Sequence, residues 1–361
     1  MIRVGLIGFG MASKVFHAPL IAAVEGLQLA AVVERSGRSA EAAYPGIATY
    51  PTLEAMLTDA TLELIVIATP NATHAQLARQ ALSAGRQVVV DKPVATNSAE
   101  IAGLIALAES QNRLLIPFHN RCWDSDFQTL HHLLHEQTLG RIVYLESTFD
   151  RWRPAPRHNF WKEDGVTPGG GNLQDLGTHL AYQAFQLFGL PDAVTADLAM
   201  ERDGGLTDDA FTLRLRYSDQ GLVVNLSSNC LAALPRPRYT VRGTKGNFVK
   251  WGLDPQEARL KETGRVIEPN WGTEPASAWG TLAVDVDGSM ITHPIKPIPG
   301  DYRLFYSGVR DAILGYAAPP VGAIEAWQAA RLLEYAVQSS KERREIPCAW
   351  DFRREQGVLT P

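Results

Sequence analysis

Cysteine is scarce in this chain, and the cysteines present are far apart. The 361 residues include 3 cysteines, namely Cys122, Cys230 and Cys348, and none of them forms a C-x-x-C pair. An odd number of scattered cysteines argues against a disulfide framework and against a cysteine-based metal site. We therefore expect no metal centre, and a protein suited to the reducing cytoplasm.

Basic runs and long apolar runs are also missing. The formal net charge is −5 and Lys and Arg form no stripe, which argues against a nucleic-acid partner. No apolar stretch approaches the roughly 20 residues that span a bilayer, so no membrane partner is expected. Because the chain begins directly with a core-strand pattern, we also expect no signal peptide.

Short apolar strands alternate with helices over the first third of the chain. The composition, with 45% hydrophobic and 20% charged residues, is that of a globular protein long enough for two domains. Strands are predicted at 3–7, 29–33, 64–68, 87–90 and 114–117, and helices at 12–24, 53–59, 73–84 and 98–111. This alternation predicts a parallel sheet covered on both faces, as in a Rossmann domain, over residues 1–119.

The pattern changes after residue 119. A helix is predicted at 125–137, strands at 142–149, 193–199, 210–217, 222–228 and 238–242, and late helices at 302–314 and 324–341. Strands joined by short turns predict a large, mainly antiparallel sheet with helices on one face. We therefore predict an α/β protein with a second, α+β domain over residues 120–361, whose last helices pack back on the first domain.

The first predicted strand runs directly into a glycine-rich turn that indicates a dinucleotide site. Gly8 allows the tight turn, and Gly10 lets a pyrophosphate approach the backbone. The next helix, from Met11 and Ala12 onward, offers its N-terminal dipole to the phosphates. Ser13 stands where this fingerprint usually has a third glycine or an alanine, so the match is imperfect.

An acidic residue follows the second predicted strand. Glu34 lies 24 residues after Gly10, near the spacing at which a carboxylate meets the adenosine ribose hydroxyls. This position favours NAD over NADP. Arg35 comes next and could clamp a 2′-phosphate, so both coenzymes stay open, with NAD slightly favoured.

Two loops follow the carboxyl ends of later strands, where ligands of such sheets bind. The cofactor-binding residues predicted there are Thr69, Pro70, Asn71, His74, Asp91, Lys92 and Pro93. The strand at 87–90 carries Lys92 to the sheet edge above the expected nicotinamide position. Pro93 then fixes the turn, which is a setting for a cis peptide bond.

Asp175 and His179 are four residues apart at the start of an apolar helix, so both should lie on one face. Buried there, an Asp–His pair can hold and pass a proton. An isolated pair of this kind is more often an exposed helix contact worth about 0.2–0.5 kcal/mol. The preceding glycines, 169–171, and the nucleotide turn favour the functional interpretation.

Four motifs occur in order and together carry a resemblance: Gly8-x-Gly10, Thr69-Pro70-Asn71-x-x-His74, Lys92-Pro93 and Asp175-x-Gly177-x-His179. The chain resembles the Gfo/Idh/MocA oxidoreductase family over essentially its whole length. Segments that begin at His119 and Asp150 are similar to the branch containing NADP-dependent scyllo-inositol dehydrogenases. The resemblance implies that Lys92, Asp175 and His179 match the family's catalytic trio, and that the second sheet often forms a dimer interface.

We therefore predict an NAD(P)-dependent dehydrogenase acting on a secondary alcohol of a cyclitol or sugar, as a homodimer or dimer of dimers. His179 is the expected general base and Lys92 the group that stabilises the alkoxide. Asp175 either orients His179 or forms a hydrogen bond with a substrate hydroxyl. Other predicted substrate-binding residues are Asn120, which should also contact the cofactor, Trp123, Arg151 and Trp161, with Arg153, Asn159 and Tyr302 as further wall residues.

Two other functions stay open from the sequence. In the first, the protein is an inactive nucleotide-binding sensor on the same fold. In the second, it cleaves glycosides through transient oxidation by NAD.

Overall fold

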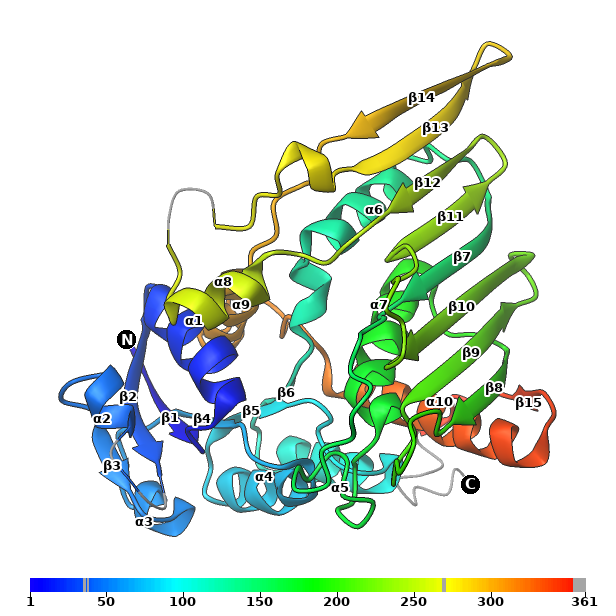
Figure 1. Ribbon diagram of the computed structural model, residues 1–361. Helices are drawn as coiled ribbons and strands as arrows, with labels where there is room; N and C mark the ends of the chain where they lie inside the picture. The colour runs from blue at the N-terminus through cyan, green and yellow to red at the C-terminus, as the bar shows by residue number, and fades with distance from the viewer. Residues whose placement is uncertain (35–36, 38, 268–270, 353–361) are drawn as a thin grey trace.

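The computed structural model describes residues 1–34, 37, 39–267 and 271–352, and Figure 1 shows two lobes that are each built on one β-sheet. The smaller sheet is entirely parallel, and the larger one is mixed and mainly antiparallel. The predicted fold class is therefore confirmed. Among the described residues, no helix is both long enough and apolar enough to cross a membrane.

The first lobe has the strand order β3-β2-β1-β4-β5-β6. Its strands are β1 (Ile2–Ile7), β2 (Leu27–Val33), β3 (Ala48–Tyr50), β4 (Leu64–Ile67), β5 (Gln87–Asp91) and β6 (Leu115–Phe118). Its helices are α1 (Ala18–Ala23), α2 (Ser39–Ala43), α3 (Leu53–Leu57), α4 (His74–Ser83) and α5 (Ser98–Ser110). Because helices cover both faces, β4 is buried along its whole length, as expected for a parallel sheet.

Strand register brings three loops of this lobe to one edge. Ile7, Ile67 and Val90 are aligned near the carboxyl ends of β1, β4 and β5. The loops that follow these strands therefore leave the sheet side by side, as the sequence predicted.

The helix predicted at 12–24 is divided in the structure. A π-helical turn, η1 (Ser13–His17), comes first and the α-helical part, α1, follows it. Pro19 lies in the first turn of α1 and has no N–H with which to continue the hydrogen-bond ladder. The change in helix type therefore falls next to the residue that interrupts regular bonding.

The second lobe has the strand order β14-β13-β12-β11-β7-β10-β9-β8-β15. Its strands are β7 (Ile142–Thr148), β8 (Ala193–Ala199), β9 (Ala210–Tyr217), β10 (Leu222–Asn229), β11 (Tyr239–Gly243), β12 (Gly246–Lys250), β13 (Gly280–Val286), β14 (Ser289–Ile295) and β15 (Ile346–Pro347). Only β7 and β10 pair in parallel among these strands. The strands β12, β13, β14 and β15 and the helix α8 (Gln256–Thr263) were not predicted from the sequence.

Helices of the second lobe lie between its sheet and the first lobe (Figure 1). They are α6 (Ser125–His135), α7 (Thr178–Phe188), α9 (Arg303–Ile313) and α10 (Ala323–Glu342). In the structure, α9 packs on α1 and α10 packs on α5. The α10 helix contributes side chains to the hydrophobic cores of both lobes. Trp327 is buried in the core of the first lobe, and Leu332 is buried in the core of the second lobe.

A side chain of α10 also completes a helix of the first lobe. The Glu334 carboxylate accepts hydrogen bonds from the Ser98 backbone N–H at 2.7 Å and from the Ser98 hydroxyl at 2.8 Å. Ser98 is the first residue of α5, where backbone N–H groups have no partner within the helix. The carboxylate therefore joins the two lobes by a charge-assisted contact.

Candidate active site

A cavity of about 1100 Å³ lies at the carboxyl edge of the parallel sheet, between the two lobes. The loops after β1, β4 and β5 form one side, and the segment 151–179 forms much of the other. The sequence-predicted residues that line it are Gly8, Gly10, Met11, Ala12, Glu34, Thr69, Pro70, Asn71, Asp91, Lys92, Asn120, Arg151, Arg153, Trp161, Asp175 and His179. Arg35 lies outside the described residues.

The glycine turn fits a dinucleotide phosphate. Gly8 has φ +85°, and a Cβ there would lie 2.8 Å from the Ala68 carbonyl oxygen, so only glycine suits this position. A Cβ on Gly10 would meet no atom within 4 Å, which shows that its backbone faces open space. The Ser13 hydroxyl donates to the Gly8 carbonyl at 2.7 Å. Serine at the third fingerprint position therefore braces the turn.

Glu34 lies on the cavity wall just beyond β2. Its carboxylate accepts hydrogen bonds from the Ser39 hydroxyl at 2.6 Å, the Ser39 N–H at 3.3 Å and the Ala40 N–H at 3.1 Å. These bonds, with that of the Ser39 hydroxyl the strongest, lower the pKa of Glu34. The start of α2 thus holds an ionised carboxylate in place at the cavity.

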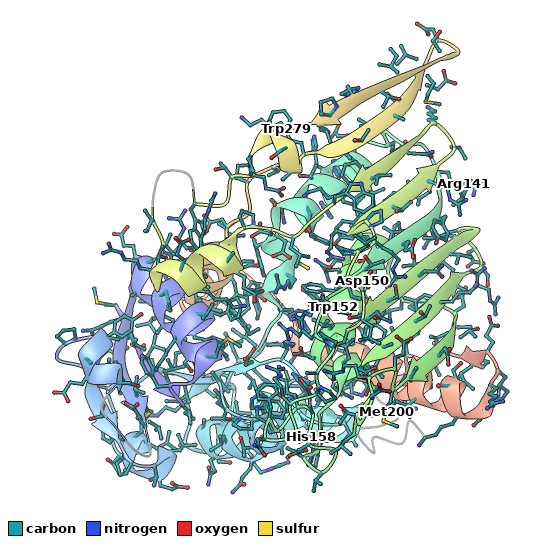
Figure 2. The ribbon with its side chains drawn as sticks, in the orientation of Figure 1. Arg141, Asp150, Trp152, His158, Met200 and Trp279 are labelled. Atoms are coloured by element: carbon teal, nitrogen blue, oxygen red, sulfur yellow. The ribbon has the colours of Figure 1, made fainter. Side chains whose placement is uncertain are left out.

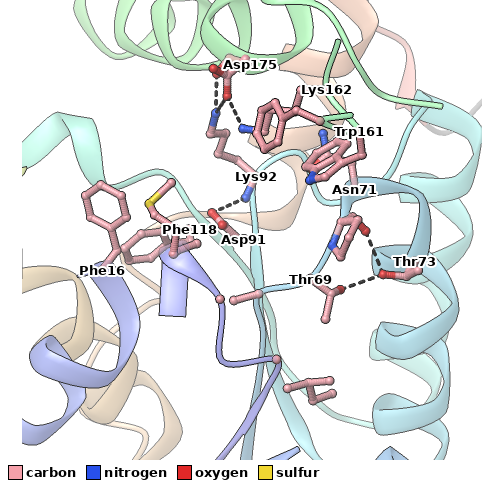
Figure 3. Close-up of a pocket in the computed structure, with 18 of the residues that line it drawn as sticks. Phe16, Thr69, Asn71, Thr73, Asp91, Lys92, Phe118, Trp161, Lys162 and Asp175 are labelled. Atoms are coloured by element: carbon pink, nitrogen blue, oxygen red, sulfur yellow. Dashed lines mark hydrogen bonds and ion pairs between the residues drawn. The ribbon is translucent and has the colours of Figure 1, made fainter. Parts of the chain in front are cut away.

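Lys92 extends from the end of β5 toward the second lobe (Figure 3). Its ammonium lies 3.1 Å from the Asp175 carboxylate and also donates to the Asp175 backbone carbonyl. The Asp91 carboxylate accepts from the Lys92 backbone N–H at 2.8 Å, and the Lys92–Pro93 peptide is cis. Burial lowers the pKa of Lys92, while the Asp175 charge opposes that shift.

Asp175 lies in a second π-helical turn, η4 (Leu173–Gly177), immediately before α7. Its carboxylate contacts Lys162 at 2.5 Å and Arg151 at 3.3 Å in addition to Lys92. Burial alone would raise the pKa of Asp175, but these three cations hold it well below its usual range. The hydrogen bonds of this carboxylate go to the cations and, within the part of the chain that the structure describes, not to His179.

His179 reaches the same cavity from the first turn of α7. The imidazole is buried, and its Nδ1 has no hydrogen-bond partner among the described residues. Its ring lies edge-on to His119 with centroids 6.1 Å apart, and His119 stacks on Tyr182. Burial, reinforced by the Lys92 charge, lowers the pKa of His179 well below its usual range. A neutral imidazole can accept a proton.

Several predicted residues lie behind the cavity lining. His74 is fully buried, and its two ring nitrogens bond the Pro93 carbonyl at 2.7 Å and the Thr69 carbonyl at 2.8 Å. Trp123 packs edge-on against Phe305 with ring centroids 5.8 Å apart. The His74 imidazole therefore ties together the two loops that carry the predicted cofactor residues, and Trp123 contributes to packing.

Two further wall candidates also lie outside the lining described for this cavity. The buried Tyr302 hydroxyl donates to Asp124 at 2.5 Å and so belongs to an internal polar network. Asn159 is exposed. The sequence analysis in turn missed Lys162, although it directly follows the predicted Trp161.

Fold and cavity together define a class of protein, an oxidoreductase with a nicotinamide-binding Rossmann domain. The family model described as "Oxidoreductase family, NAD-binding Rossmann fold" matches residues 2–119. The model described as "Oxidoreductase family, C-terminal alpha/beta domain" matches residues 131–348. The chain belongs to the Gfo/Idh/MocA oxidoreductase family.

Similar proteins span nearly the whole chain. The uncharacterized oxidoreductase YdgJ of Escherichia coli is 43% identical and covers 95% of this chain and 97% of its own. The scyllo-inositol 2-dehydrogenase (NADP(+)) IolW of Bacillus subtilis is 31% identical and covers 96% and 95%. A solved structure from Yersinia pestis, 43% identical, superposes with a TM-score of 0.90 over 96% of this chain and 97% of its own.

Proposed function

We propose that the protein is an NAD(P)-dependent dehydrogenase that interconverts a secondary alcohol and a ketone on a cyclitol or sugar. The observation that carries this proposal is the meeting of Lys92, the neutral His179 and the glycine turn in one cavity. The similarity to IolW of Bacillus subtilis, a scyllo-inositol 2-dehydrogenase, supports a polyol substrate.

A nicotinamide coenzyme, when bound, supplies the hydride acceptor for alcohol oxidation. His179 accepts the hydroxyl proton, because its imidazole is neutral and lines the cavity. Lys92 donates a hydrogen bond to the same oxygen and stabilises the developing alkoxide. Asp175 holds the Lys92 ammonium at the sheet edge. In ketone reduction, His179 returns the proton.

The proposal is tested by screening the purified protein against inositols, aldoses, ketoses and their oxidised forms with both coenzymes. Absorbance near 340 nm follows coenzyme reduction or oxidation. We expect net hydride transfer with at least one polyol. Release of an aglycone without net coenzyme reduction would point to glycoside cleavage, and coenzyme binding without any turnover would point to a sensor.

For the coenzyme, we propose a preference for NAD, because Glu34 can accept hydrogen bonds from both ribose hydroxyls. Three hydrogen bonds hold its carboxylate, so a 2′-phosphate would meet a fixed like charge. We expect Glu34→Ser to raise kcat/KM with NADP relative to NAD by about tenfold, roughly the effect of one charged hydrogen bond. A wild-type preference for NADP that the substitution leaves unchanged would contradict the role given to Glu34.

A further inference from the structure

Positive charge exceeds negative charge at the centre of the cavity. The single Asp175 carboxylate contacts three cations: Lys92 and Lys162, which Figure 3 shows beside it, and Arg151. These side chains are mostly buried, with exposed fractions of 12%, 26% and 21%, so water screens their mutual repulsion only in part. The Asp91 carboxylate also lines the cavity beside Lys92. Without a ligand, the three cations therefore exceed the two carboxylates, Asp175 and Asp91, by one positive charge.

A fourth cation, Arg153, adds to the excess. Its guanidinium lines the cavity but contacts no carboxylate in the described part of the chain. Arg153 is exposed, but partial burial of its guanidinium and the Arg151 and Arg157 charges lower its pKa. By contrast, Arg157 is paired with Glu163 at 2.6 Å. Arg153 is therefore a cation held among other cations.

The backbone holds Arg151 and Arg153 in position. The N–H groups of these residues donate to the carbonyls of Asn229 and Cys230, at 2.9 and 2.8 Å. In this extended segment alternate side chains share a side, so both arginines face the cavity whereas Trp152 is 58% exposed (Figure 2). The two guanidiniums are thus presented to the cavity together.

The coenzyme does not supply the missing negative charge at this place. Its phosphates belong at the glycine turn of Gly8 and Gly10, on the first lobe, whereas the arginines come from the second. The nicotinamide ring of an oxidised coenzyme also carries a positive charge. A charged group on the substrate can compensate the positive charge that the carboxylates of the cavity leave.

We infer that the substrate is an anionic polyol, whose carboxylate or phosphate binds Arg153, Arg151 and Lys162 while its carbinol lies at Lys92 and His179. This inference rests on the proposed dehydrogenase function and narrows its substrate class. Guanidinium groups bind either anion through paired hydrogen bonds, and such charge-assisted bonds are stronger than neutral ones.

Calorimetric titration of the coenzyme-saturated protein with glucose, glucuronate and glucose 6-phosphate tests the inference. We expect at least one anion to bind about tenfold or more tightly than glucose, and the better anion shows whether a carboxylate or a phosphate is preferred. Arg153→Gln should abolish the preference. Arg141→Gln is the matched control, because Arg141 is exposed directly before β7, at the strand ends that point away from the first lobe (Figure 2), and should leave the preference intact.

Equal or tighter binding of glucose, no binding of any of the three probes, or a preference that survives Arg153→Gln would overturn the inference. Measurements of turnover distinguish a failure of this inference from a failure of the proposed dehydrogenase function. If neutral polyols reduce the coenzyme and no anion is preferred, the dehydrogenase proposal stands and the anionic substrate does not. If anions are preferred but no hydride is transferred to or from any polyol, the failure lies with the dehydrogenase proposal.

Discussion

Lys92→Ala and His179→Ala are each expected to lower turnover by about 10²–10⁴-fold while leaving coenzyme affinity nearly unchanged. His179 offers the neutral imidazole on the cavity wall that takes the alcohol proton. Lys92 is the cation that stabilises the oxygen once the proton leaves. Neither side chain belongs to the glycine turn, so the site for the coenzyme phosphates should persist.

Steady-state kinetics on the polyol identified by screening, together with a coenzyme titration, measure the two effects separately. Lys261→Ala is a matched control for the lysine, since Lys261 lines the cavity but pairs with Glu257 at 2.5 Å. His135→Ala is the control for the histidine, because His135 is exposed. Near-normal turnover of the His179→Ala variant would show that His179 is not the general base.

Asp175→Asn should lower the free energy of unfolding by about 3 kcal/mol at neutral pH, the usual effect of breaking a buried ion pair. The substitution keeps the shape of the side chain but leaves Lys92, Lys162 and Arg151 without their shared anion. Urea unfolding of both proteins measures the loss. Adding Lys162→Gln to the variant should restore part of the stability, because one of the repelling cations is then removed.

The loss of unfolding free energy caused by Asp175→Asn should depend on pH in a defined direction. The pKa of Asp175 is lower in the folded protein than in the unfolded chain, where it is about 3.9. Its stabilising effect is therefore fully present above that value and is lost as the pH falls toward the folded-state pKa. We expect the difference between wild type and Asp175→Asn to be largest above about pH 5 and to shrink in acid. A difference independent of pH would show that packing, and not charge, is responsible.

Features with a local cause could be predicted from the sequence. The apolar strands and the turn at Gly8 follow from side-chain pattern and backbone conformation, and the structure agrees with both. The place of Lys92 directly after a strand and that of Asp175 in the turn before a helix each follow from local pattern. The predicted cavity residues therefore come largely from these two local signals.

Features that depend on distant residues could not be predicted in this way. The cation cluster on Asp175 needs Lys92 and Lys162, which lie 83 and 13 residues away, so the sequence suggested His179 as its nearest polar neighbour. From the sequence, Trp123 cannot be told apart from an aromatic residue that lines a substrate pocket. Its packing on Phe305 becomes visible in the structure. The strand β14 escaped prediction because every residue of it but the last is exposed, so no apolar alternation marks it.

The position of α10 has a consequence for synthesis of the protein on the ribosome. The nucleotide-binding lobe is made first, yet Trp327, which lies in its core, and Glu334, which bonds the first residue of α5, are added some two hundred residues later. Domains made early usually fold as soon as they emerge. Here the early half lacks part of its core and a partner for the Ser98 N–H until nearly the whole chain has been translated.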